Sequence, residues 1–131
     1  MNDLDHARLL AVMARKDFNA IEAMHDRQKF AEEIFGFHAQ QAIEKGLKAW
    51  LASRSLAYPL RHDLDELFEL LEKHRVEISQ FRPLASFTEF AVDMRYEEVE
   101  STKPTLKRSL VCSQIGAFLD HVEKLITPSG G

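Results

Sequence analysis

Five stretches of the chain place apolar residues at alternating intervals of three and four, the spacing that lines one face of an α-helix. The first two stretches cover roughly residues 3–24 and 27–54, and the other three begin near residues 62, 83 and 104. Only 5 Gly and 4 Pro interrupt the 131 residues, and we find no period-two strand pattern. The sequence therefore predicts an all-α protein, an up-and-down bundle of four to five helices. We expect one helical domain over residues 1–127 and a flexible tail at residues 128–131.

The repeating positions predict which face of each helix is buried. Pro59 ends the second helix, whereas Pro83 and Pro104 suit the first turns of the fourth and fifth helices. Asp17 interrupts the apolar line of the first helix, and Cys112 lies beside that of the fifth, where we expect a core residue and not a nucleophile. The predicted buried positions are Leu10, Met13, Ile21 and Met24 in the first helix, Leu64, Leu67, Phe68 and Leu71 in the third, Leu84, Phe87, Phe90, Ala91 and Met94 in the fourth, and Val111, Ile115, Phe118, Val122 and Leu125 in the fifth.

The composition limits the classes of function. A net charge of -4 argues against a dominant electrostatic surface for nucleic acid, although a local basic groove stays open. The single Cys allows no internal disulfide, which is typical of a reducing compartment. Acidic residues stand near the N-terminus, and no apolar run approaches the roughly 20 residues of a membrane span. We therefore expect a cytoplasmic protein with no membrane association.

The second helix carries a polar stripe within the apolar stretch FHAQQAIEKGLKAWL, residues 37–51. Successive helical residues rotate by about 100°, so five polar side chains fall within about 60° of Gln41. Glu44 and Lys48 are four residues apart, in the order that favours an ion pair. The simplest interpretation is a solvated face opposite the buried one. The five side chains are His38, Gln41, Glu44, Lys45 and Lys48.

The same side of this helix is apolar one to two turns earlier, at Phe30, Ile34 and Phe37. The N-terminal half of the helix is therefore apolar nearly all round, which requires a second partner surface. That surface is either another helix or a second subunit, and we expect a homodimer.

The order of four motifs resembles the HEPN family, the higher eukaryote and prokaryote nucleotide-binding domains. The motifs are ARKDFNAI at residues 14–21, the stretch at 37–51, RHDLDEL at 61–67 and MRYEE at 94–98. The resemblance spans about residues 9–122. It implies a bundle of four or five helices that is often dimeric, and a partner that is a small nucleotidyltransferase encoded beside it or fused to it. Family members are proposed to bind nucleotide or RNA.

The resemblance also implies a ligand site. Lys and Arg suit phosphate, Tyr suits stacking on a base, and His and Asp supply hydrogen bonds. Helix capping is the alternative role for Asp63, and a helix-end cation and a core aromatic are the alternatives for Arg95 and Tyr96. For Asp17 we favour pairing with a buried structural partner, such as Arg95, over a catalytic role. We expect Lys45 and Lys48 to line a groove with Arg95 and Tyr96, between the second and fourth helices. The family's motif positions correspond here to Gln41, Glu44, Lys45, Lys48, His62, Asp63, Arg95 and Tyr96.

Two departures bear on activity. The family's Arg-Tyr-Pro is Arg95-Tyr96-Glu97 here. The ribonuclease members carry an Arg followed, after four to six residues, by a His, and this motif is absent from the sequence. Arg54 and His62 come nearest to it, with seven residues between them. We find no metal-ligand pattern, no glycine-rich phosphate loop and no nucleophile motif. We therefore expect no cofactor and no catalytic residues, with a nucleotide as the ligand.

Three functions remain open. The leading one is a non-catalytic module that binds nucleotide or a partner nucleotidyltransferase, as half of a two-component, toxin–antitoxin-like system. The second is a degenerate or non-standard ribonuclease in which Arg95 and His62 meet in space. The third is a purely structural dimerisation module whose polar stripe is only solvated surface.

Overall fold

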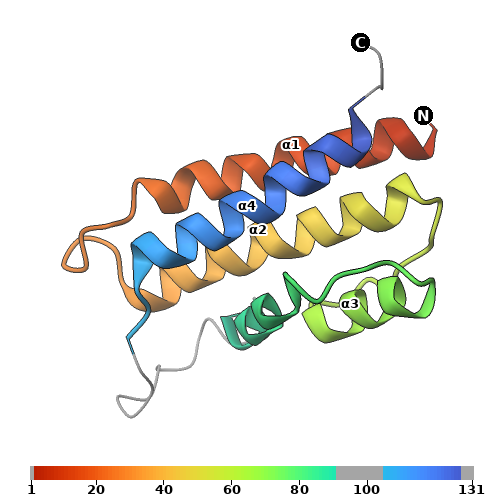
Figure 1. The fold of residues 1–131 in the computed structure, drawn as a ribbon. Helices are drawn as coiled ribbons and strands as arrows, with labels where there is room; N and C mark the ends of the chain where they lie inside the picture. Colours follow the sequence, from red (N-terminus) through yellow and green to blue (C-terminus); the bar gives the residue numbers. More distant parts are fainter. Residues whose placement is uncertain (1, 91–104, 128–131) are drawn as a thin grey trace.

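A computed structural model describes residues 2–90 and 105–127, and every regular element in these ranges is helical. The elements are α1 (Asp3–Glu22), α2 (Glu32–Ser53), α3 (Leu64–Lys73), the 3₁₀-helix η1 (Arg82–Phe90) and α4 (Arg108–Ile126). Figure 1 shows α2 between α1 and α4 on one side and α3 and η1 on the other. The predicted all-α bundle is confirmed. The predicted tail at 128–131, together with Ala91, Met94, Arg95 and Tyr96, lies outside the described residues.

The predicted start of the second helix is wrong by five residues. Helix α2 begins at Glu32 and not near Arg27, because Asp26 holds the preceding residues in a turn. The Asp26 carboxylate accepts hydrogen bonds from the backbone of Gln28 and Lys29, at 2.9 and 3.3 Å. An acidic side chain that binds the backbone two residues later favours a turn over a helix. The aromatic ring of Phe30 therefore lies before the helix, where it packs against the core.

The connection after α2 brings distant residues together. Ser55 has a φ of 58°, and the backbone N–H of Leu56 donates to the carbonyl of Leu51 at 2.9 Å, which closes the helix end and reverses the chain. The chain then returns along α2 until the carbonyl of His62 accepts a hydrogen bond from Gln40, at 3.4 Å. Helix α3 therefore begins beside the middle of α2 (Figure 1).

Small residues make the contact between α1 and α2. Ala7 and Ala14 of α1 and Ala39 and Ala42 of α2 are fully buried, so the two backbones can approach closely. The buried face of α1 is therefore centred near Ala14 and includes Phe18. The prediction that Met13 is buried is wrong: the residue lies about 100° from Ala14 around the helix and is 39% exposed.

Most of the predicted buried positions in the later helices are confirmed, with two corrections at α4. Leu125 is 49% exposed because it lies at the edge of the buried face, in the last turn. The helix begins at Arg108 and not near Pro104. The buried Arg108 guanidinium donates to the carbonyls of Met24 and Phe30, at 2.7 and 2.8 Å, and so fastens the start of α4 to the connection between α1 and α2.

Cys112 lies in the core, as predicted. Burial raises the pKa of its thiol, and the nearby charge of Glu22 adds to this effect. A thiol with a raised pKa is a poor nucleophile at neutral pH, which agrees with a packing role.

A buried polar network as candidate functional site

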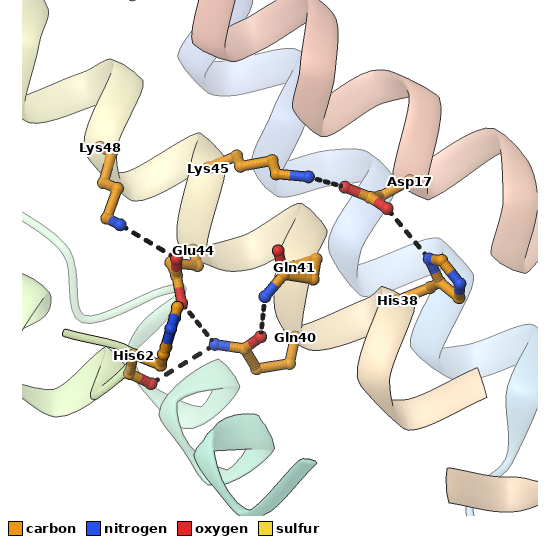
Figure 2. Close-up of polar contacts among 8 residues, drawn as sticks. All are labelled: Asp17, His38, Gln40, Gln41, Glu44, Lys45, Lys48 and His62. Carbon is orange, nitrogen blue, oxygen red and sulfur yellow. Dashed lines mark hydrogen bonds and ion pairs between the residues drawn. The ribbon is translucent and has the colours of Figure 1, made fainter. Parts of the chain in front are cut away.

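The polar stripe of α2 is not a solvated face. Gln40 is fully buried and Glu44 is 3% exposed, although both lie on a helix whose other buried residues are mainly apolar. Five side chains form a connected set, which we call the Glu44 network (Figure 2): Gln40, Gln41, Glu44, Lys48 and His62.

Glu44 is the centre of this network. Its Oε1 accepts hydrogen bonds from Gln40 Nε2 at 2.8 Å and from His62 Nδ1 at 2.9 Å. Its Oε2 accepts from Lys48 Nζ at 3.0 Å, which confirms the predicted ion pair. Gln41 completes the set by donating to Gln40 Oε1 at 2.7 Å. Both carboxylate oxygens of Glu44 are therefore satisfied, as a buried charge requires.

The environment keeps Glu44 ionised. Burial by itself raises the pKa of the carboxyl group, but hydrogen bonds from Gln40, His62 and Lys48 together outweigh that effect and lower the pKa below its ordinary value of 4.5. An ionised carboxylate only accepts hydrogen bonds, so His62 Nδ1 must carry the proton of their shared bond. The Nε2 atom of His62 then faces away from Glu44, on a side chain that is 41% exposed.

Lys48 lies between the buried carboxylate and an aromatic ring. Its Nζ is 5.5 Å from the centroid of the Tyr58 ring, a favourable cation–π distance. The Tyr58 hydroxyl is 2.8 Å from His6 Nε2, so α1 helps to hold this ring in place. The Lys48 side chain is 13% exposed, and Glu44 uses one of the three N–H donors of its ammonium group.

Lys45 belongs to a second, separate network, which we call the Asp17 network and which consists of Asp17, His38 and Lys45. Its Nζ donates to Asp17 Oδ2 at 2.6 Å, and Asp17 Oδ1 is 3.0 Å from His38 Nδ1. Figure 2 shows Lys45 extending toward α1, away from Glu44. Asp17 therefore has a structural role, as predicted, and its partners among the described residues are Lys45 and His38. Arg95, the partner suggested from the sequence, lies outside the described residues.

The predicted site residues separate into three groups. Gln41, Glu44, Lys48 and His62 lie in the Glu44 network, whereas Lys45 lies in the Asp17 network. The third group is Asp63, which caps α3 by accepting a hydrogen bond from the backbone N–H of Asp65 at 2.9 Å, as its alternative role predicts. Arg95 and Tyr96 lie outside the described residues.

The described part of the fourth predicted helix packs at the N-terminal half of α2, and Arg95 and Tyr96, which the predicted groove requires, lie outside the described residues. Helix η1 packs against α2, as the predicted groove requires, but Phe90 lies at Gly36 in the N-terminal half of α2. A Cβ atom at Gly36 would be 2.2 Å from the Phe90 ring, so only glycine allows this close contact. Lys48 lies twelve residues further along α2, about 18 Å at 1.5 Å per residue.

Sequence reasoning missed two members of this region. Gln40 lies about 100° from Gln41 around the helix, at the edge of the stripe, and its role depends on the return of the chain to His62. The doubled Gln was its only signal. Tyr58 carried no signal, because its contact with Lys48 arises from the path of the connection between α2 and α3.

The two networks are close to electrically neutral, since two lysines face two carboxylates. What the Glu44 network presents outward is the remaining N–H capacity of Lys48 and the Nε2 atom of His62. In the described ranges, no group of three or more His, Cys, Asp or Glu side chains is arranged to hold a metal ion. None of the helices in these ranges is long and apolar enough to cross a membrane.

The fold and the Glu44 network define a small helical-bundle domain with a buried polar centre on its second helix. The sequence profile of the HEPN domain matches residues 7–125, most of the chain. The protein therefore belongs to the HEPN domain family. No curated protein matches the chain. No solved structure matches it either.

Proposed function

We propose that this protein is a non-catalytic HEPN-domain module that binds the phosphate groups of a nucleotide or an RNA segment at Lys48 and His62. The observation that carries the proposal is the buried, ionised Glu44, whose two carboxylate oxygens accept hydrogen bonds from Lys48 and His62 and so hold both side chains in place. Lys48 then needs little reorganisation to donate its remaining N–H groups to an anion. His62 donates to the same anion in its doubly protonated form, in which Nε2 also carries a proton. A preorganised cation binds phosphate more strongly than a mobile surface lysine, because less side-chain entropy is lost.

The overall negative charge does not prevent such a site. Charges separated by more than about 8 Å are largely screened at physiological salt, whereas a direct charge-assisted hydrogen bond is not. Tyr58, beneath Lys48, offers an aromatic ring beside the same position. We propose that this ring borders the space for the sugar or base.

Calorimetric titration of the full chain with ATP at modest ionic strength tests the proposal. The variant Lys48→Met removes the charge and keeps a side chain of similar length. We expect its affinity for ATP to fall about tenfold or more, since hydrogen bonds to charged groups contribute about 1.5–3 kcal/mol. Lys16→Met, which removes an exposed lysine from α1, is the matched control and should bind as the wild type does. No binding at millimolar ATP, or equal loss in both variants, would contradict the proposal.

A ribonuclease is the second candidate, and the geometry of His62 favours it. The carboxylate of Glu44 fixes the proton on Nδ1, which leaves Nε2 as an oriented base in the neutral ring. A base in this position could take the proton from a ribose 2′-hydroxyl group. The absence of the family's Arg–His motif argues against this function, because the arginine of that motif would bind the scissile phosphate.

Incubation with RNA in the absence of metal separates the two candidates. The binding module predicts no cleavage above that of a His62→Ala variant. Cleavage that both His62→Ala and Glu44→Gln abolish, with the fold retained by circular dichroism, would instead establish the ribonuclease.

We also propose that the module acts with a partner nucleotidyltransferase, as half of a two-component, toxin–antitoxin-like system, and that it is a homodimer. Support for a subunit interface comes from the large apolar side chains left exposed on α1 and α2: Leu4, Leu9, Val12, Met13 and Ile34. Co-expression with the product of a neighbouring nucleotidyltransferase gene, followed by co-purification, tests the partner. Recovery of the protein without the enzyme would count against it.

A further inference from the structure

A pocket lies away from the Glu44 network, where the end of α2, the segment after α3 and the last turns of α4 meet. Its volume is about 540 Å³. Aromatic rings line one side: the His121 ring lies 5.1 Å from Trp50 and 5.3 Å from Phe81, centroid to centroid. Leu125, which is largely exposed, adds an apolar edge. The pocket therefore offers one apolar, ring-lined wall.

The same pocket is lined by two arginines that have no anionic partner among the described residues. Arg54 and Arg75 form no ion pair and no side-chain hydrogen bond within the part of the chain that the structure describes. The other arginines in that part each pair with a carboxylate: Arg8, Arg15, Arg27, Arg61, Arg82 and Arg108. Both unpaired guanidinium groups thus belong to one pocket of an acidic protein.

The location of the arginines has a simpler partial explanation. Arg54 is the C-cap of α2, and Arg75 directly follows the C-cap of α3. A cation at a helix C-terminus interacts favourably with the helix dipole. However, Arg75 has a φ of 62°, a left-handed conformation in which glycine is the favoured residue. The dipole explains a cation near each helix end but does not explain why a side chain is kept at this strained position.

We propose that this pocket binds a small molecule that carries both a phosphate monoester and a planar ring, the chemistry of a mononucleotide. The guanidinium groups of Arg54 and Arg75 would donate to the phosphate oxygens, a geometry for which arginine is well suited. The ring of the ligand would lie against His121 and Leu125. Glu77 also lines the pocket, but its carboxylate accepts hydrogen bonds from Ser79, and two arginines leave the pocket positive in sum. The site is distinct from the one proposed at Lys48.

Trp50 supplies a direct readout, because it is the single tryptophan of the chain and its ring contacts His121 in this pocket. We expect AMP to change the tryptophan fluorescence in a saturable way. Inorganic phosphate alone and adenosine alone should each bind at least tenfold more weakly than AMP, because each fills only half of the pocket.

Arg75→Gly is the decisive variant, since glycine relieves the left-handed strain while removing the cation. We expect it to stay folded and to bind AMP about tenfold or more weakly. Ser55→Gly is the matched control, because Ser55 has a φ of 58° and carries no charge; its AMP binding should be unchanged. Lys48→Met should also keep the fluorescence response to AMP, which separates this site from the proposed function.

Four results would contradict the proposal. One is the absence of any saturable AMP response. Another is a response that Arg75→Gly leaves intact. The third is a response that Lys48→Met removes and Arg75→Gly does not, which would assign the binding to the Glu44 network. Equal affinity for phosphate and AMP would refute the role of the ring.

Discussion

Replacing Glu44 by Gln removes the charge at the centre of the network and keeps the shape of the side chain. The amide oxygen can still accept a hydrogen bond from Gln40, but Lys48 loses its carboxylate partner. Removing one member of a buried ion pair costs about 3–5 kcal/mol when the other charge stays buried. Lys48 and His62 have side chains 13% and 41% exposed, so both can turn partly toward water. We therefore expect Glu44→Gln to lower the free energy of unfolding by about 2 kcal/mol at pH 7.

The pH dependence follows from the lowered pKa of Glu44. Burial opposes ionisation, but the three hydrogen-bond donors outweigh it, so the native state holds the proton less tightly than the unfolded chain does. A lowered pKa contributes stability that is fully present above the ordinary value of 4.5 and is lost as the pH falls through the lower native value. The difference in unfolding free energy between wild type and Glu44→Gln should therefore shrink below pH 4.5.

Urea unfolding followed by circular dichroism measures this difference. At pH 7 the midpoint should fall by about 1–2 M, given slopes of about 1–3 kcal/mol per molar urea for small proteins. Glu69→Gln, which alters an exposed carboxylate on α3, is the control and should change stability by less than about 0.5 kcal/mol. A Glu44→Gln effect that is the same at pH 7 and at about pH 3.5, or no larger than the Glu69→Gln effect, would refute the reasoning.

Two further predictions concern packing and assembly. Gly46→Ala should lower the free energy of unfolding by about 1 kcal/mol in urea titrations. The added Cβ atom would lie 2.5 Å from the buried Phe118 ring, and the resulting strain of about 1–3 kcal/mol exceeds the gain of about 1 kcal/mol in helix propensity. Equal or higher stability would show that the ring can move aside. Ile34→Asp places a charge on a side chain that is 38% exposed, and we expect light scattering at tens of micromolar to show a dimer for wild type and a monomer for the variant. A monomeric wild type would exclude the homodimer.

The helices themselves were predictable because their apolar spacing depends on nearest neighbours along the chain. The predicted apolar faces of the third and fifth helices are likewise buried, because the spacing of three and four places their side chains on one side. The capping role of Asp63 is equally local, since its partner is two residues away. Local patterns misled at the start of α2, where the Asp26 side chain competes with the helix, and at the edges of the buried faces, where Met13 and Leu125 are exposed.

Apart from the Glu44–Lys48 pair, whose members are four residues apart, the partners within the candidate site were not predictable, because they depend on packing between distant segments. Asp17 meets Lys45 only through the register of α1 on α2, which its neighbours in sequence do not encode. His62 meets Glu44 only because the connection after α2 returns along that helix. The polar stripe therefore looked like a solvated face, although its central carboxylate is buried.

A nuclear magnetic resonance titration with ATP tests the central claim most directly, because it locates the ligand residue by residue. If Lys48 and His62 bind phosphate groups, the His62 ring signals and the backbone amides around Lys48 should shift together, with one saturation curve. Their response should be absent in Lys48→Met and retained in Lys16→Met. Saturating ATP that shifts neither Lys48 nor His62, or that shifts only the Trp50 indole of the pocket at Arg54 and Arg75, would contradict the claim that the Glu44 network is a ligand site.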